Sequence, residues 1–453
     1  MRPPPSILPF LVLLAACGDP EETGDDTGTP APVAVWPEWA WMPWAWEDAP
    51  DADSTLALVD GYQSRDIPLG AVILDASWAN PEAGFEWDAT RFPDPQGLVD
   101  ALHARSVRTL LWLAPGIDVQ AKALWAHARE NGWFMLESAD SDAKVLDWWG
   151  SQGSLLDPFN PEAVAWWHSL WEPLLDLGID GWRCDDLDSP ALLAPYSPAL
   201  GRLVTRAEYA EAYYRDVFDH TQAVLGEDRL VHARAVDNNG SGQGGEEVAF
   251  APRDLTWAGW AADQDATFEG MEDALDNMYW SAEYGYLAFG PDIGGLRDDG
   301  SKLGRSREVF LRWAGVGAFG PVMENGGSGE HRPWAFDEET ARIYKDFADI
   351  HVALLPWMRQ RGAEAFAEGR SLFSFRDRST YAWVLGEDLF VVPMFEEGTS
   401  LTVTFPEEGH WIWIFGPSQR FEGGLSITLN IPYDTFPAFA REGSEILDLL
   451  ALD

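Results

Sequence analysis

Hydrophobic and polar positions follow two different patterns along the chain, and the change falls near residue 356. Before it, short apolar runs typical of buried strands alternate with longer segments of helical period. This order indicates βα units around a parallel sheet. The strand candidates, each followed by polar, Gly- or Asp-bearing residues, are Gly70–Asp75, Val107–Ala114, Ile179–Asp185, Leu230–Ala235, Leu255–Ala261, Gly285–Phe289 and Gly317–Met323.

These seven candidates lack one strand of a complete barrel, and we place the eighth near Trp133–Glu137. Helical patterns separate the strands, for example over Pro95–Ala104 and Pro161–Leu177. The pattern therefore predicts an α/β protein whose (β/α)8 TIM barrel occupies residues 36–355.

Past residue 356 the apolar runs become short and are separated only by turns. This spacing predicts a small all-β sandwich domain over residues 356–453. Its strand candidates are Tyr381–Leu385, Leu389–Pro393, Leu401–Phe405, Trp411–Phe415 and Leu425–Ile431.

The N-terminus has the pattern of an export signal. A basic start, Met1–Arg2, precedes the apolar run Ile7–Ala16 and then Cys17. Leu14-Ala15-Ala16-Cys17 resembles the lipobox of bacterial lipoproteins, which predicts a signal peptide over residues 1–17 and a lipid on Cys17. Residues 18–35 then carry five acids, no base and no aromatic residue, and we expect a disordered tether. The chain would be an exported lipoprotein of the cell envelope, held to the membrane by its N-terminal lipid alone.

Composition narrows the class of partner. The 453 residues carry 75 acidic and 30 basic side chains, for a formal charge of −45. Such a charge repels nucleic acid and anionic lipid surfaces, so a neutral oligosaccharide or glycoside is the better partner. The eight His do not cluster with carboxylates at ligand spacing, and there is no Gly-rich phosphate loop. We expect neither a metal nor a cofactor.

Carboxylates at strand ends carry the candidate chemistry, because barrel active sites are built at those ends. In the segment 178–188 (GIDGWRCDDLD), alternation puts Arg183 and Asp185 on one face of the strand. Asp185 then ends the strand at the barrel mouth. We interpret Asp186 and Asp188 as solvated loop acids or helix caps.

Two later segments repeat this arrangement. In residues 257–270, Asp263 follows Trp260, and apolar surroundings would favour the protonated form that a proton donor needs. Asp265 is the competing acid, or else the N-cap of a helix beginning near Ala266. In Phe289–Gly295 (FGPDIGG), Asp292 offers two acceptors to sugar hydroxyls beside glycines that let a ligand approach, although a tight structural turn would explain the same residues.

Together these segments resemble glycoside hydrolase family 31, the family of α-glucosidases and α-xylosidases. The resemblance runs from about Trp39 to Glu445 and includes further matches in the same order. They are Phe85–Pro95, Leu111–Pro115, Leu155–Pro161, Glu308–Trp313 and Leu385–Pro393.

The resemblance implies roles for individual positions. The family's nucleophile falls on Asp185 and its acid/base on Asp263. Its contacts to the sugar before the scissile bond fall on Asp75, Trp112, Arg234 and Asp292, and we add Trp260 and His331 as candidate substrate contacts. Two such carboxyl groups about 5–5.5 Å apart would support a retaining double displacement.

The chain also departs from the family pattern. Glu324 and Gly326 stand where the family usually has an Arg and a sugar-contacting His after the eighth strand. Either His331 or Glu330 folds back to substitute, or His331 lies on the surface. Pro291 replaces a His of many members. The β-sandwich that most members carry before the barrel is not expected here, and the aromatic run Trp36–Trp46 either caps the site or packs against the barrel's flank.

The leading hypothesis is a retaining, exo-acting α-glycoside hydrolase for α-glucosides, α-xylosides or α-galactosides. An α-transglycosylase would use the same residues. A catalytically silent carbohydrate-binding lipoprotein is the alternative from another class, since substrate-contact positions are altered.

Overall fold

The structure is a computed structural model that describes residues 36–148, 151–185, 195–234, 236, 250–261 and 263–452. The predicted lipidation site Cys17 and the predicted tether lie outside the described residues, as do Asp186 and Asp188. Within the described ranges, no helix is both long enough and apolar enough to cross a membrane.

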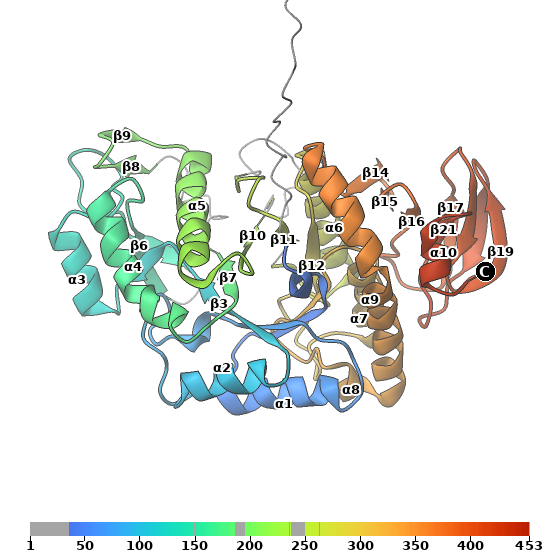
Figure 1. Ribbon diagram of the computed structural model, residues 1–453, viewed down its shortest axis with the longest axis horizontal. Coiled ribbons are helices and arrows are strands. Elements are labelled where there is room, and N and C mark those ends of the chain that lie inside the picture. Colours follow the sequence, from blue (N-terminus) through green and yellow to red (C-terminus); the bar gives the residue numbers. More distant parts are fainter. Residues whose placement is uncertain are drawn as a thin grey trace, which may run out of the picture. The chain divides into compact units, whose positions relative to one another are not determined.

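Eight parallel strands close into a barrel, which confirms the predicted TIM-barrel fold (Figure 1). Their order around the barrel is β1-β13-β12-β11-β10-β7-β3-β2. Most of the strand residues are buried, as expected for parallel strands covered on both faces. The strands are β1 (Trp44–Glu47), β2 (Ala71–Leu74), β3 (Arg108–Leu113), β7 (Gly181–Cys184), β10 (Leu230–Arg234), β11 (Ala258–Ala261), β12 (Phe289–Ile293) and β13 (Glu324–Asn325).

Helices lie outside this ring of strands (Figure 1). Asp94 and Asn160 cap α2 and α4 through their side-chain oxygens, and a proline follows each cap at the first helical position. Both helices were expected from the sequence, and each ends within two residues of its predicted bound. The helices are α1 (Ala52–Gln63), α2 (Pro95–His103), α3 (Lys122–Glu130), α4 (Pro161–Leu175), α5 (Arg206–Leu225), α6 (Phe268–Glu283), α7 (Arg307–Ala318), α8 (Pro333–Phe336), α9 (Glu338–Ala367) and α10 (Glu445–Leu449).

Three of the predicted strands do not coincide with the barrel strands of the structure. Trp133–Glu137 makes only isolated bridges, at Phe134 and Leu136, and is not a barrel strand. Gly317–Met323 covers the end of helix α7 and the turn after it, while the strand there is the polar pair β13. The prediction Gly285–Phe289 overlaps β12 only at Phe289, so Asp292 lies inside the strand. The expected tight turn begins at Asp292, whose carbonyl accepts from the backbone N–H of Gly295 at 3.0 Å.

The aromatic run Trp36–Trp46 supplies the missing eighth strand. Trp44 and Trp46 alternate with Ala45 along β1, which pairs with β2 and β13 and closes the barrel. Trp39 and Trp41 belong instead to a short 3-10 helix, η1 (Glu38–Trp41), and are buried. The expectation that this run packs against the barrel's flank therefore applies only to its first half, which includes Trp39 and Trp41.

Short elements decorate the barrel between its strands. A second 3-10 helix, η2 (Ala76–Trp78), follows β2 directly. A three-stranded sheet joins β4 (Gly116–Asp118), β6 (Ser151–Leu155) and β5 (Leu146–Trp148), and a two-stranded one joins β8 (Tyr196–Ser197) and β9 (Arg202–Leu203).

An antiparallel β domain follows the barrel, as predicted. The expected boundary between residues 355 and 356 falls inside α9, which holds Pro356 in its interior and ends at Ala367. A six-stranded and a two-stranded sheet then enclose a core that includes Phe390, Phe405, Trp411 and Phe439. The strands are β14 (Phe373–Asp377), β15 (Ala382–Leu385), β16 (Leu389–Val391), β21 (Ala438–Arg441), β18 (His410–Trp413) and β19 (Gly416–Glu422) in the larger sheet, and β17 (Ser400–Thr404) and β20 (Ser426–Asn430) in the smaller.

Candidate active site

Asp185 directly follows β7, at the carboxyl end of the barrel strands. The expected alternation holds, because Trp182 faces outward and its Nε1 donates to Thr221 Oγ1 of α5, whereas Arg183 faces the barrel interior. Trp112 Nε1 of the neighbouring strand β3 donates to Asp185 Oδ2 at 3.1 Å. The structure thus brings the predicted Trp112 and Asp185 into direct contact.

Arg234, the last residue of β10, joins the two predicted catalytic carboxyl groups. Its Nε lies 2.9 Å from Asp185 Oδ1, and its Nη2 lies 2.6 Å from Asp263 Oδ2. The Arg234 side chain is 3% exposed, against 18% for Asp185 and 32% for Asp263. One buried guanidinium therefore fixes two partly open carboxyl groups at the barrel mouth through charge-assisted hydrogen bonds. The expectation of apolar surroundings for Asp263 is wrong, because its carboxyl is partly exposed and pairs with Arg234.

Asp263 has a left-handed backbone conformation, with φ of 69°. Non-glycine residues adopt this region rarely, and such strain concentrates at functional sites. The competing acid Asp265 is exposed and pairs at 2.7 Å with Arg297. Its predicted role as an N-cap is wrong, because α6 begins at Phe268 and Thr267 caps it.

A second arginine lies within the barrel near this pair. Trp46 and Trp260 flank Arg183, whose guanidinium carbon lies 4.3 Å and 4.5 Å from the two ring centroids. Trp260 also lies 5.0 Å from the guanidinium carbon of Arg234. The ring of Trp260 is 1% exposed and contacts both cations, so its observed role is to support the two arginines.

Arg183 pairs with two buried acids on the far side of the barrel. Its Nη2 lies 3.2 Å from Asp292 Oδ1, and its Nη1 donates to Glu324 Oε1. Glu324 Oε2 in turn lies 3.3 Å from Nε2 of His232 on β10. Burial and the guanidinium of Arg183 hold the pKa of His232 well below its usual value, so its imidazole is neutral.

Asp75, the first residue after β2, has a strongly shifted acidity. Burial, helped by the carboxylates of Asp48 and Asp185, raises the pKa of Asp75 to about 8, although Arg183 acts in the opposite direction. Asp75 is thus mainly protonated at neutral pH. A protonated carboxyl can donate one hydrogen bond to a sugar hydroxyl and accept another.

Trp46 fills the space beside Gly326. A Cβ on Gly326 would lie 2.2 Å from the Trp46 ring. His331 is 3% exposed, so the expectation of a surface residue is wrong. Burial lowers the pKa of His331 to about 3, and its ring interacts with the backbone of Trp46. No described hydrogen bond joins His331 to Asp185, Asp263 or Asp292.

The sequence did not single out Arg183, Trp46 or His232 as site residues, although all three contact predicted ones. The signal for Arg183 was its position two residues before Asp185 on the same strand face. The aromatic run that ends at Trp46 was expected either to cap the site or to pack against the barrel's flank. His232 gave no signal, because a lone imidazole in a strand is usually core.

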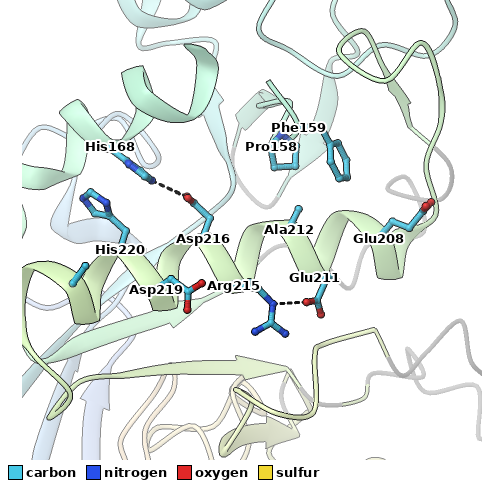
Figure 2. A pocket seen from close by; sticks show the side chains of 11 residues that line it. Pro158, Phe159, His168, Glu208, Glu211, Ala212, Arg215, Asp216, Asp219 and His220 are labelled. Atoms are coloured by element: carbon cyan, nitrogen blue, oxygen red, sulfur yellow. Dashed lines mark hydrogen bonds and ion pairs between the residues drawn. The ribbon is translucent and has the colours of Figure 1, made fainter. Parts of the chain in front are cut away.

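A separate pocket of about 740 Å³ lies between α4, α5 and the segment Pro158–Phe159. Figure 2 shows His168 of α4 facing Asp216 of α5, and their Nε2 and Oδ2 atoms are 2.9 Å apart. None of the predicted site residues lines this pocket. No group of three or more His, Cys, Asp or Glu in the described part of the chain is placed to hold a metal ion.

Known proteins share this barrel and β domain. The TIM-barrel domain of glycosyl hydrolases family 31 matches residues 33–360, and the family's C-terminal domain matches residues 368–446. An alpha-xylosidase of Emericella nidulans is 25% identical over 93% of this chain and 54% of its own length. A 1,3-alpha-isomaltosidase of Kribbella flavida is 24% identical over 85% of this chain and 58% of its own.

A solved structure shares the fold. The family 31 dextranase of Flavobacterium johnsoniae, in complex with isomaltotriose, has a TM-score of 0.77 at 20% identity and covers 90% of this chain and 52% of that one. The chain spans about half the length of the curated relatives it matches. The two domain matches together cover most of the sequence, and the chain belongs to glycosyl hydrolase family 31.

Proposed function

We propose that this protein is a retaining, exo-acting hydrolase of α-glycosides. The observation that carries the proposal is the bridge from Arg234 to both Asp185 and Asp263. A retaining double displacement needs two carboxyl groups about 5–5.5 Å apart, and one guanidinium that binds both keeps them close together. Relatives named alpha-xylosidase and 1,3-alpha-isomaltosidase support α-linked substrates.

In this mechanism Asp185 attacks the anomeric carbon and forms a covalent glycosyl-enzyme. Asp263 first protonates the departing glycosidic oxygen and then takes a proton from the water that hydrolyses the intermediate. The hydrogen bond from Trp112 and the ion pair with Arg234 orient the Asp185 carboxylate. Asp75 and Asp292 hold hydroxyls of the glycone, supported by Trp260 through Arg234 and by His331 at the edge of the site.

A panel of aryl α-glycosides (glucoside, xyloside and galactoside) tests the proposal with wild type, Asp185→Ala and Asp263→Ala. Asp185→Ala should abolish turnover. Asp263→Ala should slow substrates with poor leaving groups far more than activated aryl glycosides, because only the former need an acid. The exposed Asp265→Ala is the matched control and should retain activity.

The outcomes separate the alternatives. If wild type binds oligosaccharides but turns over no α-glycoside, the chain is a carbohydrate-binding protein and the enzyme proposal is wrong. Transfer to an added sugar in preference to water would identify a transglycosylase, which uses the same two aspartates. An equal loss on both leaving-group classes in Asp263→Ala would contradict the role of Asp263.

We also propose that the protein is exported and anchored by a lipid on Cys17, with no other membrane contact. The sequence around Cys17 supports this, and the charge of −45 gives no surface attraction to anionic lipid. Metabolic labelling with a fatty acid should mark the wild type and not Cys17→Ser. The buried Cys184 serves as the control, since Cys184→Ser should keep the label. Labelled Cys17→Ser protein would contradict the anchor.

A further inference from the structure

The barrel interior holds more acids than cations. Arg183 donates to both Asp292 and Glu324, and all three side chains are almost fully buried, at 4% or less exposure. Asp75 and Asp185 interact electrostatically with the same guanidinium. The other nearby cation, Arg234, is paired with Asp185 and Asp263. Ionising every one of these acids would leave buried negative charge without compensation, which is costly in a low dielectric.

Two carboxyl oxygens in this cluster have no N–H donor. Asp292 Oδ2 and Glu324 Oε2 are both buried, and neither accepts a hydrogen bond from a described N–H or O–H group. The other oxygen of each group binds the guanidinium of Arg183, which holds the two carboxyl groups close together. Two ionised carboxylates held this close repel each other, so the arrangement favours a proton on one of them.

The remaining neighbour, His232, is neutral and adds no positive charge to the cluster. Its imidazole is fully buried between the rings of Trp44 and Trp260, at centroid distances of 4.9 Å and 4.8 Å. Its two nitrogens are also without hydrogen-bond partners among the described residues. A neutral His232 can accept a hydrogen bond from a protonated Glu324 Oε2 across the 3.3 Å between them.

We propose that Glu324 is a protonated positioning residue, whose carboxyl O–H donates a hydrogen bond to Asp292 or His232 while Arg183 binds its other oxygen, and which thereby fixes Asp292 for the glycone. This inference rests on the proposed function for its catalytic consequence. Burial raises the pKa of Glu324 well above its usual value, and the carboxyl of Asp292 adds to the shift while Arg183 opposes it.

The contacts around Arg183 link the position of Glu324 to that of Asp292. Trp46 and Trp260 hold the Arg183 guanidinium from two sides, so it has little freedom to follow only one of its acids. Arg183 precedes Asp185 by two residues on β7, and Asp292 pairs with Glu324 in the register of β12 and β13. A change at Glu324 should therefore alter glycone binding more than the chemical step.

Two substitutions separate a protonated Glu324 from an ionised one. Glu324→Gln keeps a donor for Asp292 or His232 and an acceptor for Arg183, so kcat/KM should stay within about threefold of wild type. Glu324→Met removes both, and kcat/KM should fall at least tenfold, mainly through KM. Glu338→Gln, at an 83% exposed carboxyl on α9, is the control for the amide substitution itself. A Gln variant as impaired as the Met variant would overturn the proposal.

A second measurement does not depend on activity. A carboxyl that keeps its proton in the folded state and loses it on unfolding destabilises the fold as pH rises above its unfolded pKa. The ratio of the unfolding constants of wild type and Glu324→Gln should therefore rise by about tenfold per pH unit above about pH 5. The groups that face Glu324 are Arg183 of β7, Asp292 of β12 and His232 of β10, and all remain in the variant.

Infrared difference spectra complete the test. The wild type minus Glu324→Gln spectrum at pH 7 should contain the carbonyl band of a protonated carboxyl, shifted in heavy water. A pH-independent stability difference with only carboxylate bands would overturn the protonated state. If these results hold but no α-glycoside is cleaved, the proposed function fails and the assignment of the proton stands.

Discussion

The ring of Trp46 fills the space that a side chain at position 326 would need. A Cβ at position 326 would lie 2.2 Å from Cδ1 and from Nε1 of the Trp46 ring, which real atoms do not tolerate. The same ring contacts the Arg183 guanidinium at 4.3 Å, so it has little room to move away. The glycine after β13 and the tryptophan of β1 therefore form a coupled pair that determines the shape of the barrel interior near Asp292 and Glu324.

The first prediction follows from this pair. Gly326→Ala should lower the free energy of unfolding by about 1–3 kcal/mol, because it overpacks a closed core. Chemical denaturation measures the loss. Gly320→Ala is the control, since a Cβ there makes ordinary contacts of 3.4 Å or more. A Trp46→Leu background should relieve part of the Gly326→Ala penalty, and additive losses in the double variant would contradict the coupling.

The second prediction concerns Arg234. Arg234→Lys keeps the charge but cannot reach Asp185 and Asp263 together, because an ammonium lacks the planar fork of a guanidinium. We expect kcat/KM on the best aryl α-glycoside to fall by about 100-fold through misplaced carboxylates. Arg297→Lys is the matched control, since Arg297 pairs with Asp265 on the surface. Similar activity in the two Lys variants would show that the bridge is dispensable.

Parts of this site could be predicted from the sequence because they are local. The runs that end in Asp185 and Asp263 carry strand pattern and acid together, so strand and candidate residue are visible at once. Arg183 and Glu324 lie 141 residues apart and meet only across the closed barrel. No local pattern connects them, and a buried carboxyl such as that of Glu324 cannot be told from a surface glutamate in the sequence.

The misplaced strands have a related cause. β13 contains only Glu324 and Asn325, two polar residues without any hydrophobic signal, and the apolar stretch before it belongs to the end of α7. β1 is four residues long and is apolar through Trp and Ala rather than through branched side chains. Barrel closure, not local propensity, makes these segments strands.

The third prediction concerns pH. The pKa of Asp75 is raised to about 8, so its neutral form predominates below that pH and a negative charge beside Asp48 and Asp185 develops above it. We expect kcat/KM to fall as pH rises through about 8, since kcat/KM reports groups of the free enzyme. Asp75→Asn, which stays neutral, should lack this alkaline limb. An unchanged limb in the Asn variant would assign it to another group.

The same shift affects stability with a defined sign. The folded-state pKa of Asp75 lies above the value of about 3.9 expected in the unfolded chain. The unfolded state therefore loses its proton first, and stability falls as pH rises from about 4 towards 8. The melting temperature of Asp75→Asn relative to wild type should thus increase between pH 5 and pH 8, and a constant difference would contradict the shift.

The last prediction concerns the junction between α7 and the β domain. Arg312 of α7 is 1% exposed, and its Nη2 donates to the carbonyls of Ile431 at 2.6 Å and Gly398 at 3.0 Å. Its guanidinium also lies 4.4 Å from the ring of Tyr433. Arg312→Met would remove both bonds and leave the buried carbonyl of Ile431 without this donor, at a cost of about 1–3 kcal/mol.

Hydrogen exchange locates that loss. Amides of the segment 429–433 should exchange faster in Arg312→Met, while the amides of barrel strands β7 and β10 keep their protection, because the lost bonds hold the β domain and not the barrel interior. Arg420→Met is the control within the β domain, since Arg420 is 52% exposed and pairs with Glu442 at the surface. Equal exchange in the two variants would mean that Arg312 does not hold this segment in place. Faster exchange only in Arg312→Met would instead identify one buried guanidinium as the main polar link between α7 and the loops at Gly398 and Ile431.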